Sequence, residues 1–144
     1  MTSQVNAGST SYDGRCNCSN IRIFVKEQPS DTLLCHCSNC RRTGAAPYSI
    51  SYILNEAEVR IDDPKSCLKV YHDSDTLTGT TGLRHFCGNC GSPIYSLSPA
   101  FPNKIILKAP LFDAVSAPST ELFAEDRYGW LRRVESVSDE RRKM

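Results

Sequence analysis

The sequence contains no long apolar run, no excess of charge of one sign and no sustained helical pattern of apolar residues. Its longest apolar runs span a few residues, whereas a membrane-spanning helix needs roughly 20, and we expect no membrane segment. The chain has 17 Lys and Arg against 16 Asp and Glu, so its overall charge does not favour binding to nucleic acid or anionic lipid. The first ten residues have neither a basic nor an apolar stretch, and we expect no secretion signal.

Short alternating segments predict a mainly β fold. In residues 21–26, the apolar Ile21, Ile23 and Val25 occupy every second position, as in a half-buried strand. Similar signals, separated by turn-forming residues, occur at 48–54, 68–71, 94–97 and 104–108. No helical period extends beyond about two turns, so helix should be a minor component.

A length of 144 residues suits a single domain, which we expect over residues 13–131. Residues 1–12 are small and polar, and we expect a disordered lead-in there. Residues 132–144 are charged and nearly free of large apolar groups, and we expect a frayed C-terminal tail. No internal repeat or low-complexity block divides the chain further.

Eight cysteines in 144 residues are the unusual feature of the composition. Seven of them form three clusters, and Cys67 stands alone. The clusters are Cys16–Cys18, Cys35–Cys40 and Cys87–Cys90. Without an export signal we expect a cytoplasmic, reducing environment, which favours metal binding or catalysis over disulfides as the reason for the clustering.

The segment Cys87–Gly91 has the form of a zinc-ribbon knuckle. Its CxxC spacing directs two sulfurs to one ion, and Gly91 suits a backbone position with positive φ. The same spacing occurs in redox proteins, but here a strand-like segment follows it. A tetrahedral site needs two more sulfurs, which the CxC pair on the early strand supplies. We therefore expect a closed, structural zinc site formed by Cys16, Cys18, Cys87 and Cys90.

Cys35, Cys37 and Cys40 remain for a second site. Three thiolates within six residues hold one face of an ion and leave the fourth tetrahedral position free. Closed four-ligand zinc sites are structural, whereas three protein ligands plus water are the pattern of catalytic sites. We expect an open, catalytic zinc here, with a closed site as the alternative. The candidates for a fourth protein ligand are His36, His72, His85 and Cys67.

These strings resemble the family of glutathione-dependent formaldehyde-activating enzymes, whose domain is shared with centromere protein V. The resemblance rests on Gly14–Cys18, Cys35–Arg41, Gly44–Ala45 and Phe86–Gly91, continues to Trp130, and covers about residues 12–131. It implies a β-tent fold of small antiparallel sheets, a structural zinc, and a second zinc on the three-cysteine cluster where a substrate thiol binds. Ser19 departs from the pattern, since many members have glycine there, and Ala109-Pro110 replaces a usual Gly-Thr.

Zinc bound by three thiolates is soft and electron-rich, which favours thiol exchange over strong Lewis-acid chemistry. Coordination deprotonates a thiol, so the site could hold glutathione as a thiolate beside an aldehyde. No Ser–His–acid series, paired-carboxylate motif or phosphate loop offers another catalytic centre. Arg41 and Arg42 are candidates for binding the glutathione carboxylates, with a solvated positive face as the alternative. His36, between two ligands, is expected to support them rather than to bind the ion.

The residues and the resemblance together predict a carbon–sulfur lyase, similar to S-(hydroxymethyl)glutathione synthase. Such an enzyme would form or break a glutathione–aldehyde adduct and would use two zinc ions and a small-molecule substrate. Two alternatives stay open. One is an isomerase, cyclase or hydrolase that acts on a specialised metabolite at the same zinc, and the other is a zinc-ribbon interaction module without activity. The assembly is also open, with a homodimer as one expectation.

Overall fold

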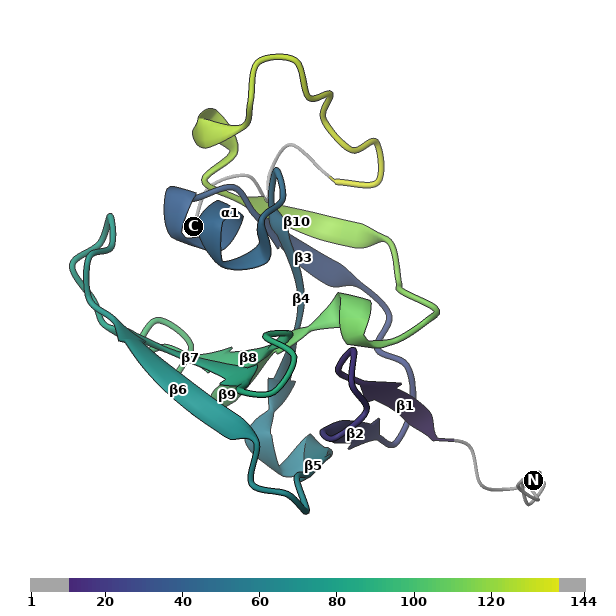
Figure 1. The fold of residues 1–144 in the computed structure, drawn as a ribbon. Helices are drawn as coiled ribbons and strands as arrows, with labels where there is room; N and C mark the ends of the chain where they lie inside the picture. Colours follow the sequence, from purple (N-terminus) through teal and green to yellow (C-terminus); the bar gives the residue numbers. More distant parts are fainter. Residues whose placement is uncertain (1–10, 138–144) are drawn as a thin grey trace.

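The computed structural model describes residues 11–137, which form ten strands in two sheets and one short α-helix (Figure 1). The strands are β1 (Tyr12–Arg15), β2 (Arg22–Val25), β3 (Thr32–Cys35), β4 (Ser49–Asn55), β5 (Val59–Asp62), β6 (Leu68–Asp73), β7 (Gly82–Cys87), β8 (Pro93–Leu97), β9 (Lys104–Lys108) and β10 (Pro118–Leu122). The helix α1 spans Ser38–Gly44, and single 3-10 turns cover Glu56–Glu58, Ala109–Leu111 and Ala124–Asp126. The mainly β prediction is confirmed. No helix in this part of the chain has the length and apolar character needed to cross a membrane.

The smaller sheet has the order β1-β2-β5 and is antiparallel throughout. The alternation seen in the sequence sets its faces, because Ile21, Ile23 and Val25 are buried while Arg22 and Lys26 are exposed. The apolar face of this sheet packs against the larger sheet.

The larger sheet has the order β10-β3-β4-β9-β8-β7-β6. Its pairs are antiparallel except for β10 and β3, which run parallel. Four of its strands, β4, β6, β8 and β9, correspond to predicted segments, whereas β3, β7 and β10 lack a clear alternation of apolar residues. Figure 1 shows the sheet curving from β10 through β4 to β6, with α1 on its inner side.

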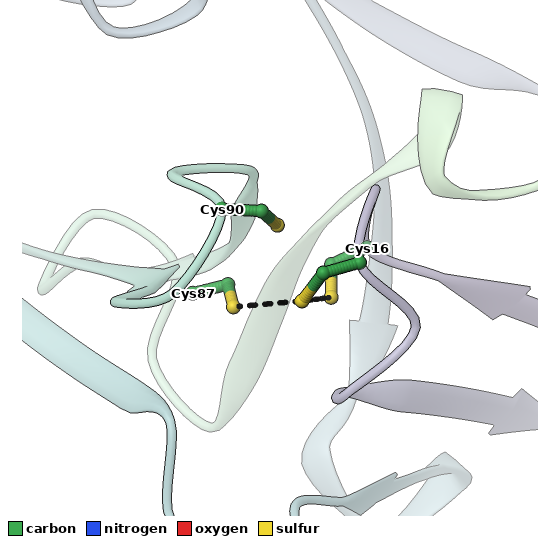
Figure 2. Close-up of side chains that lie close together, drawn as sticks. Cys16, Cys87 and Cys90 are labelled. Atoms are coloured by element: carbon green, nitrogen blue, oxygen red, sulfur yellow. Dashed lines mark hydrogen bonds between the residues drawn. The ribbon is translucent and has the colours of Figure 1, made fainter.

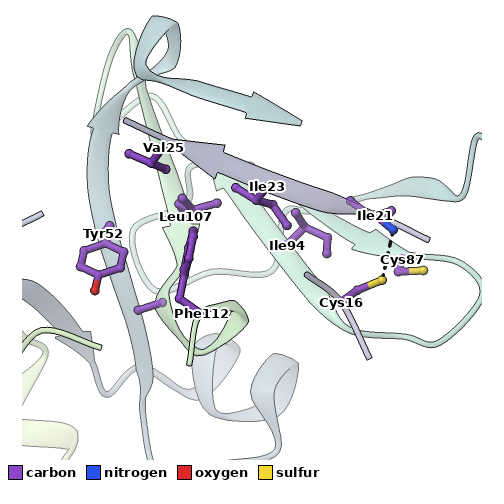
Figure 3. Packing of buried hydrophobic residues seen from close by; sticks show 10 residues of the cluster. Cys16, Ile21, Ile23, Val25, Tyr52, Cys87, Ile94, Leu107 and Phe112 are labelled. Carbon is purple, nitrogen blue, oxygen red and sulfur yellow. Dashed lines mark hydrogen bonds between the residues drawn. The ribbon is translucent and has the colours of Figure 1, made fainter. Parts of the chain in front are cut away.

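Side chains from both sheets meet in one apolar core (Figure 3). Its fully buried members include Ile21, Ile23, Ile94 and Leu107. Burial of an aliphatic side chain of this size stabilises the fold by about 1.5–3 kcal/mol. Cys16 and Cys87 belong to the same cluster, so the core continues directly into one of the cysteine clusters.

The described chain extends slightly beyond both ends of the predicted domain. Tyr12 begins β1, and its ring stacks on that of Phe112 with 4.0 Å between the centroids. Its hydroxyl lies 2.8 Å from the hydroxyl of Tyr52, and burial together with this hydrogen bond raises the pKa of Tyr12. At the other end, Val137 is buried. The rest of the predicted lead-in and tail, residues 1–10 and 138–144, lies outside the described residues.

Gly14 lies where β1 passes closest to the segment after β9. A Cβ on Gly14 would lie 2.8 Å from the carbonyl oxygen of Leu111 and 2.9 Å from Cδ1 of Phe112. Because the first of these contacts is with backbone, we expect Gly14→Ala to lower the free energy of unfolding by about 1–3 kcal/mol, measured by urea unfolding. Gly44→Ala is the matched control, since nothing lies within 4 Å of its Cβ. Equal unfolding free energies for the two variants would contradict this packing argument.

Candidate metal centres

Four cysteines from two distant parts of the chain meet at the junction of the sheets. Cys16 and Cys18 lie in the turn between β1 and β2, not on a strand as expected, and Cys87 and Cys90 form the knuckle after β7. The four sulfurs lie within 4.8 Å of one another, with 3.6 Å between those of Cys16 and Cys18 and 3.8 Å between those of Cys18 and Cys87. Figure 2 shows the sulfurs of Cys16, Cys87 and Cys90 directed toward a common centre. This donor set matches tetrahedral zinc sites.

Two residues with left-handed backbone shape the turns that present these sulfurs. Gly91 has a φ of 82°, as its place after the knuckle predicts, and its N–H donates to the Cys87 carbonyl at 2.7 Å. Ser19 has a φ of 68°, in the region that favours glycine. This explains physically why glycine suits the position of Ser19 in the sequence pattern. The guanidinium of Arg15 donates to the hydroxyl of Ser19 at 3.0 Å and holds the turn.

The two thiols of the knuckle, Cys87 and Cys90, ionise very differently. Burial raises the pKa of Cys87 to about 12. At Cys90, burial acts in the same direction, but hydrogen bonds with Ser92, Cys18 and Cys87 together outweigh it and lower the pKa to about 5. Thiolates this close repel one another, so all four sulfurs carry charge together only when a cation lies between them. The cluster could therefore hold a metal ion, whose binding would release protons.

The second cluster lies where β3 leads into α1. Cys35 ends β3, and the sulfur of Cys37 caps the helix by accepting from the N–H of Cys40 at 3.4 Å. The three sulfurs lie within 4.8 Å of one another. Among residues 11–137, no further Cys, His, Asp or Glu joins this group. It could hold one metal ion through three protein ligands.

None of the four candidates for a further ligand joins this group in the described chain. The ring of His36 pairs with a buried carboxylate, and that of His85 stacks on an aromatic ring. His72 is exposed on β6, and Cys67 lies in the turn between β5 and β6. In residues 11–137, the structure thus brings together Cys35, Cys37 and Cys40 without any of these four.

A buried network of ion pairs and hydrogen bonds holds the Cys35–Cys40 loop in place. His36 is 1% exposed, and its Nε2 lies 2.9 Å from Oε1 of Glu121, whose Oε2 accepts from Arg127 at 3.1 Å. Arg41 donates to the carbonyl oxygens of His36 and Asp126, at 2.6 and 2.8 Å. The loop is therefore tied to β10 and to the segment that follows it.

The three thiols of this cluster share their charge unequally. Hydrogen bonds with Cys35 and Cys37 lower the pKa of Cys40, while hydrogen bonds with Cys37 and Cys40, together with burial, raise the pKa of Cys35. The first proton therefore leaves easily and the last one leaves only with difficulty. Full ionisation of the cluster, as in a metal site, requires positive charge nearby.

Two cations, on the strands either side of β8, supply positive charge beside Cys40. Lys108 on β9 is 9% exposed, and its Nζ contacts the hydroxyl of Ser51 at 3.4 Å. Burial lowers the pKa of Lys108, and the charge of the Cys40 thiolate opposes this shift. Arg84 on β7 also interacts with Cys40, and its Nε donates to Asp73 at 2.6 Å. Sequence reasoning missed both cations. For Lys108, its charge at the end of the otherwise apolar predicted strand 104–108 was a usable signal, whereas β7 gave none for Arg84.

Asn39, between two of the cysteines, links the cluster to the β6–β7 hairpin. Its side-chain amide donates to both carboxylate oxygens of Asp73, at 3.0 and 3.1 Å, and to the carbonyl of Asp75 at 2.8 Å. Asp73 therefore bridges α1 and Arg84. The sequence offered no signal for this contact, because its partners are more than 30 residues apart.

The three cysteines open into a pocket of ≈ 360 Å³ inside the curve of the larger sheet. Arg84, Lys108 and the hydroxyls of Ser49, Ser51 and Ser96 line it, together with many apolar side chains. A smaller pocket of ≈ 140 Å³ shares Arg84, Lys108 and Ser96 with it. All three cysteines line the larger pocket, whereas none of them lines the smaller one.

Arg41 and Arg42, the predicted binding residues, do not line this pocket. They border a separate depression with Ser38 and Tyr128, and the guanidinium of Arg41 lies 4.6 Å from the centroid of the Tyr128 ring. The reason is helical geometry, since each residue after Cys40 is rotated by about 100° around α1. The cations of the pocket come instead from β7 and β9.

Two cysteine clusters on two packed sheets define the class of this protein, a small mainly β domain suited to hold metal ions. The sequence profile described as "Glutathione-dependent formaldehyde-activating enzyme" matches residues 11–126. The chain therefore belongs to the glutathione-dependent formaldehyde-activating enzyme family, as the resemblance predicted.

Individual relatives agree with this assignment. The chain is 28% identical over 135 residues to a protein of Halomonas elongata named "Putative glutathione-dependent formaldehyde-activating enzyme", with 90% of this chain and 84% of the relative covered. It is also similar to the crystal structure of a Rhodobacter sphaeroides protein, with a TM-score of 0.57 and 24% identity over 72% of this chain and 90% of that one. The second likeness supports the fold.

The buried network around Glu121 leads to a prediction about stability. Glu121→Gln leaves Arg127 and His36 without their buried carboxylate, and we expect the free energy of unfolding to fall by about 3 kcal/mol. Urea unfolding measures this. Asp62→Asn is the matched control, because its pair with Arg60 is exposed on both sides and should contribute at most about 1 kcal/mol. A loss for Glu121→Gln no larger than for the control would show that the network does not stabilise the loop.

Proposed function

We propose that this protein forms or cleaves the carbon–sulfur bond of a thiol–aldehyde adduct at a zinc ion held by Cys35, Cys37 and Cys40, with glutathione as the thiol. The observation that supports this most is the three-sulfur cluster itself, which faces a pocket and has no fourth protein donor within residues 11–137. Three protein ligands are the pattern of zinc sites that bind a substrate. Membership of the family supports the same chemistry.

The donor set and its surroundings suit zinc. Cysteine thiolates are soft ligands that favour zinc over magnesium or calcium. Bound zinc would supply the acidity that keeps a substrate thiol deprotonated at neutral pH. Three thiolates and one divalent ion carry a net charge of about −1. Lys108 and Arg84 are positive and Asp73 is negative, so these three side chains together offset the charge of the metal site. The near-neutral total lowers the electrostatic free energy needed to add an anionic thiolate.

Lys108 is the residue of this chain that we expect to act on the carbonyl. When the thiolate sulfur attacks the carbonyl carbon, an electron pair moves to the oxygen and an oxyanion develops. The buried ammonium of Lys108 stabilises this charge in a setting of low dielectric constant. A proton from solvent then completes the hydroxyl of the adduct, and the reverse order of events cleaves it.

The cluster of Cys16, Cys18, Cys87 and Cys90 takes the structural role in this proposal. Its four sulfurs complete a tetrahedral set, so no position remains for a substrate. An ion there would close a loop of about 70 residues and would contribute directly to folding. A reducing compartment such as the cytoplasm would keep all seven sulfurs available as ligands.

The division of roles can be tested by two matched substitutions. We expect two zinc ions per wild-type chain, one ion and a normal cooperative unfolding transition in Cys37→Ser, and loss of the cooperative transition in Cys87→Ser. Elemental analysis, circular dichroism and a glutathione–formaldehyde adduct assay measure the three properties. Cys37→Ser should also abolish the activity. The opposite pattern, with Cys37→Ser unfolded and Cys87→Ser active, would reverse the two assignments.

Thiol binding should depend on pH in a defined way. A free thiol has a pKa of about 8.5 and binds zinc as a thiolate, so one proton is released below that pH. The affinity of the zinc-loaded protein for glutathione should therefore rise about tenfold per pH unit between pH 6 and 8, and level off above the thiol pKa. Calorimetry in buffers of different ionisation enthalpy measures both the affinity and the released proton. An affinity independent of pH would exclude direct sulfur coordination.

A further inference from the structure

We propose that the aldehyde used at the three-cysteine cluster carries an apolar alkyl or aryl group larger than methyl. This inference rests on the proposed function and deepens it by naming the substrate class. It comes from the order of side chains along the pocket, which changes from charged and hydroxylated beside the sulfurs to apolar further out.

This order follows from the alternation of side chains along three adjacent strands, in which every second residue points to the same face. On β3, Cys35 and Leu33 share a face, and on β9 the same holds for Lys108 and Ile106. The strand between them, β4, has Ser51 paired with Lys108 and Ile53 paired with Ile106. All six residues line the pocket. Leu33 pairs with Ser51, so the apolar wall begins on β3 at the level of Ser51 and Lys108, and on β4 and β9 it begins one step further, at Ile53 and Ile106.

Aromatic and aliphatic side chains extend this wall to the mouth of the pocket. Leu77, Phe101 and Phe123 line it from three separate loops. Leu77 is 63% exposed, so it contributes a large apolar surface to a part of the pocket that faces solvent. Burial of this surface of Leu77 does not stabilise the free protein, but it would contribute to binding an apolar group.

The distribution of charge in the pocket supports the same substrate class. No Asp or Glu is among its lining residues in the described chain, and the cations, Arg84 and Lys108, lie beside the sulfurs. These two cations would stabilise the negative charge of a thiolate or of an oxyanion at the reacting atoms of the substrate. The apolar wall formed by Leu33, Ile53 and Ile106 offers no partner to a charged group, and the polar lining residues from the loops, Thr76, Thr78, Thr80 and Ser98, carry only neutral hydroxyls. Formaldehyde is too small to reach this wall, whereas an alkyl chain on the carbonyl carbon would displace water from it.

S-alkyl glutathiones mimic the adducts of longer aldehydes and test the inference by binding alone. We expect S-hexylglutathione to bind the zinc-loaded protein at least about tenfold more tightly than S-methylglutathione in calorimetry, since each buried methylene contributes up to about fourfold. Leu77→Ser should remove about threefold or more of this preference without changing the thermal unfolding, and Leu77→Met should keep the preference. Val70→Ser is the matched control, because Val70 is 45% exposed and does not line the pocket.

A rate assay with glutathione separates this inference from the proposed function. We expect a higher kcat/KM for hexanal than for formaldehyde. Three results would overturn the apolar-substituent inference and leave the proposed reaction standing. They are equal binding of the two S-alkyl compounds, an equal loss of the S-hexyl preference in Val70→Ser and Leu77→Ser, and a higher kcat/KM for formaldehyde than for hexanal. If no aldehyde reacts faster than without protein, the proposed reaction itself is wrong.

Discussion

The convergence of Cys16, Cys18, Cys87 and Cys90 is the constraint on which the rest of the structure depends. It brings the turn after β1 next to the knuckle after β7, where a bound metal ion would hold the three-stranded sheet against the seven-stranded one. The apolar core continues from this point, because two of the cysteines are buried in the same cluster as the isoleucines of both sheets. A small domain of short strands buries limited apolar area. A metal ion that closes a long loop would therefore add stability where hydrophobic burial alone gives little.

The second cluster uses the scaffold differently. Its cysteines come from one strand end and the first turn of a short helix, and no Cys, His, Asp or Glu from a distant segment of the described chain joins them. Neighbouring side chains hold the loop of this cluster in place instead. Glu121 and Arg127 hold the peptide between two of the ligands, and Asn39 ties the helix to the β6–β7 hairpin. The loop is thus supported from both sides, while the sulfurs stay open toward the pocket.

The electrostatics of the pocket follow from strand pairing. Three clustered thiolates repel one another, and the pKa values of Cys35 and Cys40 move in opposite directions because they share protons. Lys108 and Arg84 reduce this repulsion from β9 and β7. Burial of a lysine is costly unless negative charge lies nearby, so the position of Lys108 and the ionised state of the cysteines support each other. The same arrangement suits a reaction in which charge moves from sulfur to oxygen.

The sequence by itself determined the features that depend on neighbouring residues. The alternation in residues 21–26 predicted the buried face of β2, and the CxxC-Gly spacing predicted the left-handed Gly91. The grouping of seven cysteines into four and three followed from their spacing as well. Only the tertiary structure decided which cations flank the three-cysteine cluster. Arg41 and Arg42 are next to Cys40 in sequence, but the turn of α1 directs them to another surface, while the pairing of β4, β9, β8 and β7 brings Lys108 and Arg84 beside it. Neighbouring residues determine the alternation of buried and exposed side chains along a strand. The order of strands in the sheet determines which distant side chains line the same pocket.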